Sequence, residues 1–173
     1  MKKQIIYSKF IPRVFAMTID FVLLFILIPP LMRIISHYVF LYFFNDFFVM
    51  YGLNGADKEV WFTAVKMPEF VEYITQNRLR EYLSITGALF LLNIIFMGVY
   101  FVTFWRKFGA TPGKMFMRMK IVDADSLARP SVRNLIKRFL GYITAIIGIW
   151  FIVFSKRGMA VHDKIANTIV IKS

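Results

Sequence analysis

An arginine and an aspartate interrupt the first apolar stretch of the sequence, and both are candidates for binding or for ion pairing. Arg13 is at the head of the run 12–28, and Asp20 is inside it. A helix rises about 1.5 Å per residue, so Asp20 is expected roughly 12 Å beyond Pro12, near the middle of a hydrocarbon core about 30 Å thick. A carboxylate at that depth costs at least about 2.5–3.5 kcal/mol, so it should face protein, water or a cation. Asp20 is therefore a candidate proton, cation or ligand site.

The competing interpretation is that Asp20 makes an interhelical hydrogen bond or ion pair that only fixes packing. Asn93, in a second apolar run, is its expected intramembrane companion, and the same two interpretations apply to it. Arg13 could anchor the helix at the interface, or it could be a fixed cation that holds an acid such as Asp20 or Asp163. A direct bridge from Arg13 to Asp20 is not expected, because two helical turns separate them by roughly 10 Å.

Two further motifs resemble catalytic ones but lack the residues that catalysis requires. The string 109–114 is one residue too short for a phosphate-binding loop, and Met115 stands where a metal-binding Ser or Thr is needed. A tight turn that holds Lys114 near the lipid headgroups is expected instead. His162 and Asp163 are neighbours, but no metal-ligand spacing or nucleophile surrounds them, so Asp163 is expected to cap or close a loop. We expect no enzymatic activity, no metal and no cofactor.

The composition is typical of an integral membrane protein. Of the 173 residues 58% are hydrophobic, 20 are Phe, and the mean hydropathy is +0.61. Three apolar runs, over 13–35, 83–105 and 139–154, account for this bias. The net charge of +12 would suggest a nucleic-acid partner in a soluble protein, but here the charge gathers at segment ends and predicts topology instead. The chain has no cysteine, which excludes disulfides and thiolate sites.

The first two apolar runs are expected to form full membrane spans. Residues 1–13 hold four Lys or Arg and no acid, which places the N-terminus in the cytoplasm. The first span is expected over 12–35, with a kink or an end at Pro29 and Pro30, because proline removes a backbone donor. The second is expected over 83–105, a stretch without a charged residue.

An insertion outside the membrane is expected between the two spans, over 36–82, which holds four Lys or Arg and six acids. Its first part, 37–53, fits an interfacial segment better than a span, because Asp46 would be costly deeper in the bilayer. Pro68 is expected to divide two amphipathic helices.

A basic cytoplasmic segment is expected over 106–138, which holds nine Lys or Arg and two acids. Pro130 is expected to open an amphipathic helix that lies on the inner leaflet, near anionic lipid headgroups. Its predicted apolar face consists of residues spaced three and four apart: Val132, Leu135, Ile136 and Phe139. A short strand over 119–122 is expected to pair with an alternating run over 168–171.

The third apolar run, 139–154, gives only about 24 Å of helix, which is short of a full crossing. It forms either a third, short transmembrane element or a re-entrant one. The tail 155–173 holds four Lys or Arg and one acid, which favours the re-entrant arrangement and a cytoplasmic C-terminus.

Four motifs, in this order along the chain, resemble those of the RDD family of bacterial membrane proteins, named for one arginine and two aspartates. They comprise Arg13, Ala16 and Asp20 in the first helix; Gly109, Thr111, Gly113 and Lys114 in a G-x-T-x-G-K turn; the strand 120–123 with the basic helix residues Arg133 and Arg138; and a closing pattern with His162 and Asp163. The closing pattern has about one extra residue between Gly158 and His162. The resemblance covers about 10–35 and 83–172, leaves 36–82 unexplained, and implies that Asp163 is the second aspartate.

The resemblance also implies a bacterial inner-membrane protein with a suspected role in transport, undefined ligands and no established enzymatic chemistry. We therefore expect an all-α integral membrane protein with two full transmembrane helices, a short re-entrant or third transmembrane element, amphipathic interfacial helices and a small cytoplasmic strand pair. All of this is expected to form one domain over 1–173.

The expected function is transport of a small ion or solute that uses Asp20. The alternative is a non-catalytic accessory or assembly subunit of a membrane complex. Because two spans cannot enclose a pathway by themselves, a homo-oligomer or a membrane partner protein is expected. The sequence names neither the ligand nor the stoichiometry.

Overall fold

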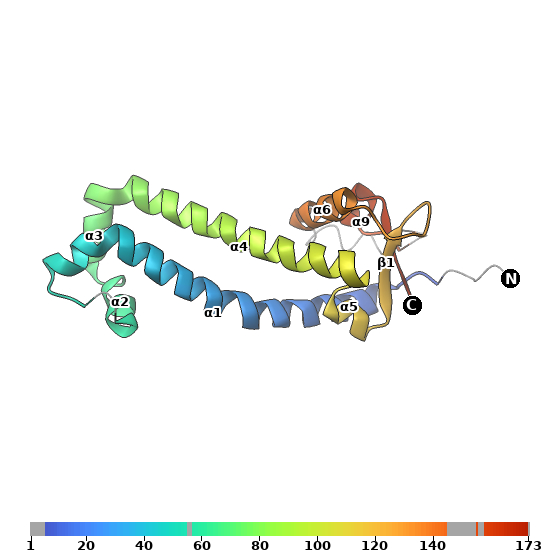
Figure 1. The fold of residues 1–173 in the computed structure, drawn as a ribbon, viewed down its shortest axis with the longest axis horizontal. Helices are drawn as coiled ribbons and strands as arrows, with labels where there is room; N and C mark the ends of the chain where they lie inside the picture. The colour runs from blue at the N-terminus through green and yellow to red at the C-terminus, as the bar shows by residue number, and fades with distance from the viewer. Residues whose placement is uncertain (1–5, 55–56, 145–154, 156–157, 173) are drawn as a thin grey trace. The chain divides into compact units, whose positions relative to one another are not determined.

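The computed structural model describes residues 6–54, 57–144, 155 and 158–172. Its elements are, in chain order, α1 (Phe10–Met50), α2 (Lys58–Ala64), α3 (Pro68–Tyr73), the π-helix η1 (Ile74–Arg78), α4 (Leu79–Phe108), α5 (Pro112–Phe116), β1 (Met119–Asp123), α6 (Val132–Leu140), the 3₁₀ helix η2 (Gly141–Thr144), α9 (Val161–Ile165) and β2 (Thr168–Lys172) (Figure 1). They form two compact units. The terminal unit comprises residues 1–25 and 96–173, and the insertion unit comprises residues 26–95.

Two long apolar helices were predicted, and both are present. α1 has 41 residues and α4 has 30. By length and composition, α1 and the helical run Pro68–Phe116, which contains α4, are each sufficient to cross a membrane. On α1, large apolar side chains that would be buried in a soluble protein are exposed: Phe15, Phe21, Val22, Phe25, Ile26, Leu27, Leu31 and Ile34.

α1 does not end at its two prolines, so that prediction is wrong. The helix continues through Pro29 and Pro30 to Met50, and it includes most of the segment that was predicted to be interfacial. Its non-helical backbone angles occur at Phe44 instead (φ −121°, ψ 23°). A proline withdraws one donor from the helix, whereas a break in apolar surroundings would leave several backbone groups without partners. Continuing the helix is therefore the less costly solution.

Aromatic side chains form the core of the insertion unit. Pro68 occupies the first turn of α3, so it divides two helices as predicted, and Asp57 caps α2 by accepting the Glu59 N–H at 2.9 Å. The buried core residues are Phe44, Phe47, Phe48, Trp61, Ala64, Phe70, Ile74 and Ile85. Asp46, which was predicted to avoid the bilayer interior, is half exposed and accepts hydrogen bonds from Tyr73 and Arg78.

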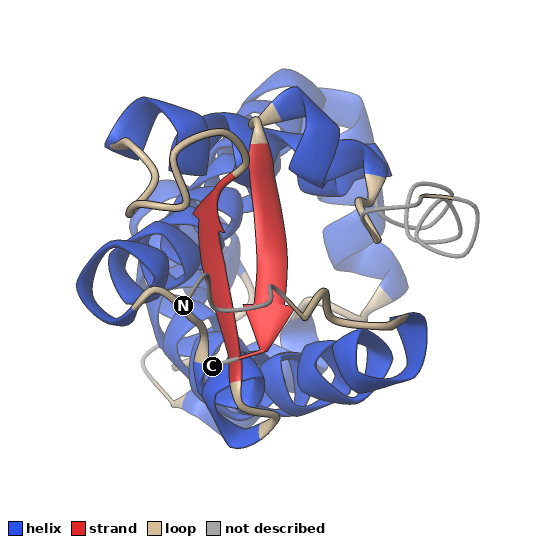
Figure 2. Cartoon of the chain, turned by 90° about the vertical axis from the view of Figure 1, so that its right-hand side faces the viewer, coloured by secondary structure: helices blue, strands red, loops and turns tan. Residues whose placement is uncertain are grey.

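The terminal unit contains the predicted strand pair. β1 and β2 are antiparallel, with Met119 opposite Lys172 and Asp123 opposite Thr168 (Figure 2). The side chains of Ile121 and Val170, which face each other in the register, are buried. The chain before α1 adds to this sheet, because the Ser8 N–H donates to the Val170 carbonyl at 3.0 Å.

The predicted amphipathic helix is α6, which begins after Ser131, whose hydroxyl accepts the Asn134 N–H at 3.2 Å. Its buried positions are Leu135 and Arg138, whereas two residues of the predicted apolar face, Val132 and Ile136, remain exposed. α6 packs beside α9 (Figure 1). Of the predicted third membrane element, 139–140 belong to α6 and 141–144 to η2, while 145–154 lie outside the described residues.

Candidate functional site

The Asp20 carboxylate is enclosed by the G-x-T-x-G-K turn. The Thr111 hydroxyl donates to Oδ2 at 2.5 Å, and the Gly113 N–H donates to Oδ1 at 2.8 Å. The ammonium of Lys114 lies 3.8 Å from Oδ2, and the Tyr100 hydroxyl donates to Oδ1 at 3.5 Å. Asp20 is only 2% exposed. The carboxylate thus faces protein, one of the environments expected for it, and both hydrogen-bond donors and a cation compensate it.

Two small residues, Ala16 and Gly113, allow the backbones of α1 and α5 to come close together. A Cβ on Gly113 would collide with the carbonyl oxygen of Ala16, which is itself fully buried on α1. Ala16 and Asp20 are four residues apart, so they share one face of the helix. Gly109 has a positive φ of 72° and accepts the Ile121 N–H at 2.7 Å, which links the end of α4 to β1.

Lys114, which was predicted to lie near the lipid headgroups, is buried. Its residue is 6% exposed, and its ammonium faces Asp20. The close contact of Gly113 with α1 carries the next residue into the interior, where an opposite charge compensates it.

Asp163 lies in a second charged cluster. Arg13 Nη1 donates to its Oδ2 at 2.5 Å, and Arg138 Nη1 pairs with its Oδ1. The Ala160 N–H donates to Oδ2 at 2.9 Å, and the other contact of Arg138 Nη1 is the Thr168 hydroxyl at 2.5 Å. Asp163 is fully buried. Of the two acids that the sequence left open as partners of Arg13, the structure gives it Asp163.

The electrostatics of this cluster keep its acid charged and its histidine neutral. Burial alone raises the pKa of Asp163, but the guanidinium groups of Arg138 and Arg13 outweigh burial and hold that pKa below its usual range. Burial lowers the pKa of His162 to about 3, and the positive charge of Arg138 contributes to the same shift. The imidazole is therefore uncharged at neutral pH, although its Nε2 lies 3.5 Å from Asp163.

Arg138 is the residue of this site that periodicity did not identify. The resemblance gave it only as part of a basic helix. The predicted apolar face was expected to lie on the inner leaflet and did not include Arg138, whereas the observed buried positions are Leu135 and Arg138. The available signal was the excess of Arg and Lys on a short helix followed by an aspartate that needs a partner.

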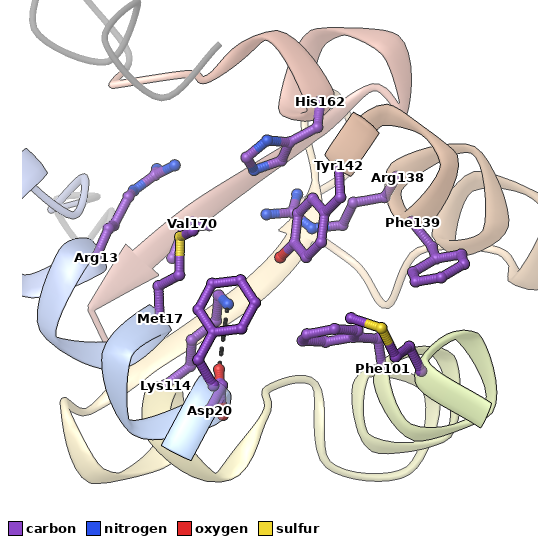
Figure 3. A pocket seen from close by; sticks show the side chains of 12 residues that line it. Arg13, Met17, Asp20, Phe101, Lys114, Arg138, Phe139, Tyr142, His162 and Val170 are labelled. Atoms are coloured by element: carbon purple, nitrogen blue, oxygen red, sulfur yellow. Dashed lines mark ion pairs between the residues drawn. The ribbon is translucent and has the colours of Figure 1, made fainter. Parts of the chain in front are cut away.

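A cavity of about 160 Å³ lies among these groups, and we call it the buried cavity (Figure 3). Its lining is mostly apolar but includes Asp20 and three cationic side chains. The lining residues are Arg13, Met17, Asp20, Phe21, Met97, Phe101, Lys114, Arg138, Phe139, Tyr142, His162 and Val170. The cavity therefore brings together residues from every motif that the sequence singled out.

Asn93, the predicted companion of Asp20, is half-buried on α4 within the insertion unit. The hydrogen-bond partners that the structure describes for Asp20 are Tyr100, Thr111 and Gly113, so the role of Asn93 stays a prediction. Within the described part of the chain, no group of three or more His, Asp or Glu side chains could hold a metal ion.

Comparison with known proteins agrees with these motifs. The model of the RDD family matches residues 7–167, a range that includes the insertion 36–82. An uncharacterized protein of Rickettsia prowazekii (strain Madrid E) is 43% identical over 173 residues, which is the whole length of both chains. No solved structure matches this chain. With its arginine and its two aspartates at buried positions in the two clusters, the chain belongs to the RDD family.

Proposed function

We propose that this chain is a non-catalytic integral membrane protein that transports a small ion or solute, and that the buried cavity is its solute site. The observation that carries this proposal is the cavity itself, which is enclosed by apolar side chains yet lined by Arg13, Asp20, Lys114 and Arg138. Buried charges in a membrane protein mark ligand or ion sites by default, because keeping them away from water is costly.

The proposed location is the bacterial inner membrane, with both termini in the cytoplasm. Seventeen of the 22 Lys and Arg residues belong to the terminal unit, which has only four acids. This imbalance supports a cytoplasmic terminal unit in contact with anionic headgroups. The exposed apolar side chains of α1, such as Phe25 at 76% exposed, support contact with lipid. Two spans do not enclose a pathway, so a homo-oligomer or a membrane partner is part of the proposal.

Asp20 has a more specific role in this proposal than a free carboxylate would have. Its two oxygens already accept from Thr111 and Gly113, and its charge compensates Lys114. We therefore assign Asp20 to the positioning of the turn and of the Lys114 ammonium at the cavity. A transported solute would contact the cationic side of the cavity rather than Asp20 alone.

An accessory or assembly subunit is the second candidate. The observation that favours it is that each aspartate is already engaged in contacts that join distant segments of the chain. Asp20 joins α1 to α5, and Asp163 joins α9 to Arg13 and Arg138. Acids engaged in this way fix packing without any solute.

Flux measured together with assembly distinguishes the two candidates. The full chain is reconstituted into vesicles, and Na⁺, K⁺, H⁺ and phosphate gradients are followed for the wild type and for Asp20→Asn. The substitution keeps the shape of the side chain but removes the charge that holds Lys114. We expect flux to fall at least about tenfold, because the substitution removes one charge-assisted contact. The protein should remain assembled in detergent.

Glu69→Gln is the matched control, because it removes one negative charge at an exposed position in the first turn of α3. It should leave both flux and assembly unchanged. Flux of any tested ion that is as fast in Asp20→Asn as in the wild type would exclude Asp20 from the transport site. No flux in either protein, with partner recovery lost in the variant, would favour the accessory role.

A further inference from the structure

The charges at the buried cavity do not balance. Three cationic side chains line it: Arg13, Lys114 and Arg138. Two acids face these cations, namely Asp20 beside Lys114 and Asp163 between the two arginines. His162, which also lines the cavity, is neutral, so one positive charge is left in excess.

No other acid of the terminal unit supplies the missing negative charge. The remaining two are Asp123, the last residue of β1, and Asp125, in the turn that follows it. Asp123 accepts the Ser126 N–H at 3.0 Å, and Asp125 accepts the Asn167 side-chain amide at 2.6 Å. The residues of this unit that the structure does not describe contain no Asp or Glu. The excess is therefore a property of the unit's sequence as well as of its geometry.

Buried donors around the cavity also lack acceptors. Among the described residues, Arg13 Nε and Nη2 and Arg138 Nε have no hydrogen-bond partner, although Arg13 is 5% exposed and Arg138 is 1% exposed. Figure 3 shows these side chains around the cavity. Buried polar groups are nearly always hydrogen-bonded, so an unpaired guanidinium donor requires an explanation. An oxyanion offers both a negative charge and several acceptors in the geometry that arginine favours.

The size and the walls of the cavity restrict what can enter. A cavity of about 150 Å³ holds a molecule the size of benzene, and this one has about 160 Å³. Its apolar lining consists mainly of Met17, Phe21, Met97, Phe101 and Phe139. A single phosphate group with a few attached carbons fits both features. A folded macromolecule does not.

We infer that the buried cavity binds an oxyanion of the phosphate class, with the anion at Arg13, Arg138 and Lys114 and its first carbons against the apolar wall. This inference rests on the proposed function only in taking the cavity as the ligand site, and it names the class of ligand. The anion comes either from a lipid headgroup or from a free small molecule. Phe21, which is 46% exposed on the surface of α1, forms part of the wall and would allow entry from lipid.

Binding is tested on the full chain in an uncharged detergent after removal of native lipid. The probes are inorganic phosphate, hexyl phosphate and phosphatidic acid, with phosphatidylcholine of the same acyl chains as the neutral comparison. Native mass spectrometry counts bound probe, and a thermal-unfolding titration gives the affinity. We expect at least one phosphate-monoester probe to bind about tenfold more tightly than phosphatidylcholine.

Two variants alter the cavity in different ways, and one control does not alter it. Met97→Trp fills the cavity without changing a charge. Lys114→Gln removes one cation while Asp20 keeps its bonds from Thr111 and Gly113. Lys137→Gln removes a neighbouring but exposed cation on α6. Each cavity variant should weaken phosphate binding about tenfold, whereas the control should change it by less than about twofold.

The outcomes separate the sources of the anion and can overturn the inference. Tighter binding of phosphatidic acid than of hexyl phosphate identifies a lipid headgroup, and equal binding identifies a small soluble anion. The inference is wrong if no phosphate probe binds, if phosphatidylcholine binds equally well, or if Met97→Trp leaves binding unchanged. The binding experiment measures no flux, so its outcome is independent of the transport experiment. A wild-type protein that binds the anion but transports none of the tested ions refutes only the proposed function. Cation flux without anion binding refutes only this inference.

Discussion

Replacing Gly113 by alanine tests whether the contact between α5 and α1 builds the Asp20 site. Gly113 lies inside α5, where alanine would ordinarily stabilise a helix by about 0.5–1 kcal/mol. The added Cβ would instead collide with the carbonyl oxygen of Ala16, a backbone atom that cannot rotate away. The sign of the effect therefore distinguishes ordinary helix propensity from the contact that the structure shows.

The magnitude follows from two losses that act against that gain. Overpacking a well-packed contact costs about 1–3 kcal/mol, and weakening the bond from the Gly113 N–H to the Asp20 carboxylate costs about 1.5–3 kcal/mol. We expect a net loss of about 2–4 kcal/mol, since the two terms overlap and helix propensity offsets part of them. For a chain of this length that corresponds to a fall in Tm of about 5–15 °C.

The assay is thermal unfolding of purified wild type and variant in the same detergent. Gly87→Ala is the matched control, because Gly87 is also inside a helix but its added Cβ would meet no atom within 4 Å. It should stay within about 1 kcal/mol of the wild type. A Gly113→Ala protein that is as stable as the Gly87→Ala protein would refute the close packing of the turn on α1.

Three further predictions concern the rest of the terminal unit. Asp163→Asn leaves two buried guanidinium groups with a neutral partner, so it should destabilise the fold by about 3–5 kcal/mol in the same unfolding assay; a loss below about 1 kcal/mol would show that the charge is not needed. Because the pKa of His162 is about 3 in the folded chain and about 6.5 when unfolded, its neutral form stabilises the fold above pH 6.5, and that stability is lost as pH falls toward 3. His162→Gln should therefore flatten the decline of Tm between pH 6.5 and 4, and an unchanged slope would contradict the burial of a neutral imidazole. Cysteines at Lys120 and Ile171, which are opposite each other, should form a disulfide readily, whereas Lys120 with Val170 should not; equal yields would contradict the register.

Features that depend on local patterns were predictable from the sequence. Strands β1 and β2 were expected within one residue of their observed ends, because alternation of β-branched residues reports a local backbone preference. The second long helix was expected for a similar reason, since a charge-free apolar run allows few alternatives. The division of the insertion at Pro68 also follows from local chemistry, because proline suits the first turn of a helix.

Features that depend on contacts between distant segments were not predictable in the same way. Asp20 and Thr111 are 91 positions apart, and no period in the sequence relates them. Reasoning from hydropathy therefore did not identify Thr111, Gly113 and Lys114 as the partners of Asp20. The same limit applies to Arg138, whose burial depends on Asp163 being placed beside it by α9. The predicted end at Pro29 and Pro30 is wrong for a different reason. Each proline does remove a backbone donor, but the apolar surroundings of α1 favour an unbroken helix.

The arginine and two aspartates that characterise this chain do not form one triad. Arg13 and Asp20 lie on the same helix, but each is bound to a different part of the chain: Arg13 to Asp163 of α9, and Asp20 to the turn that leads into α5. These two contacts hold the start of α1 against α9 and against α5, and residues from both contacts line the buried cavity. Neither aspartate is then free to bind a cation by itself, because each already has cationic partners. What the arrangement leaves uncompensated is positive charge, and this is why the proposed ligand is an anion.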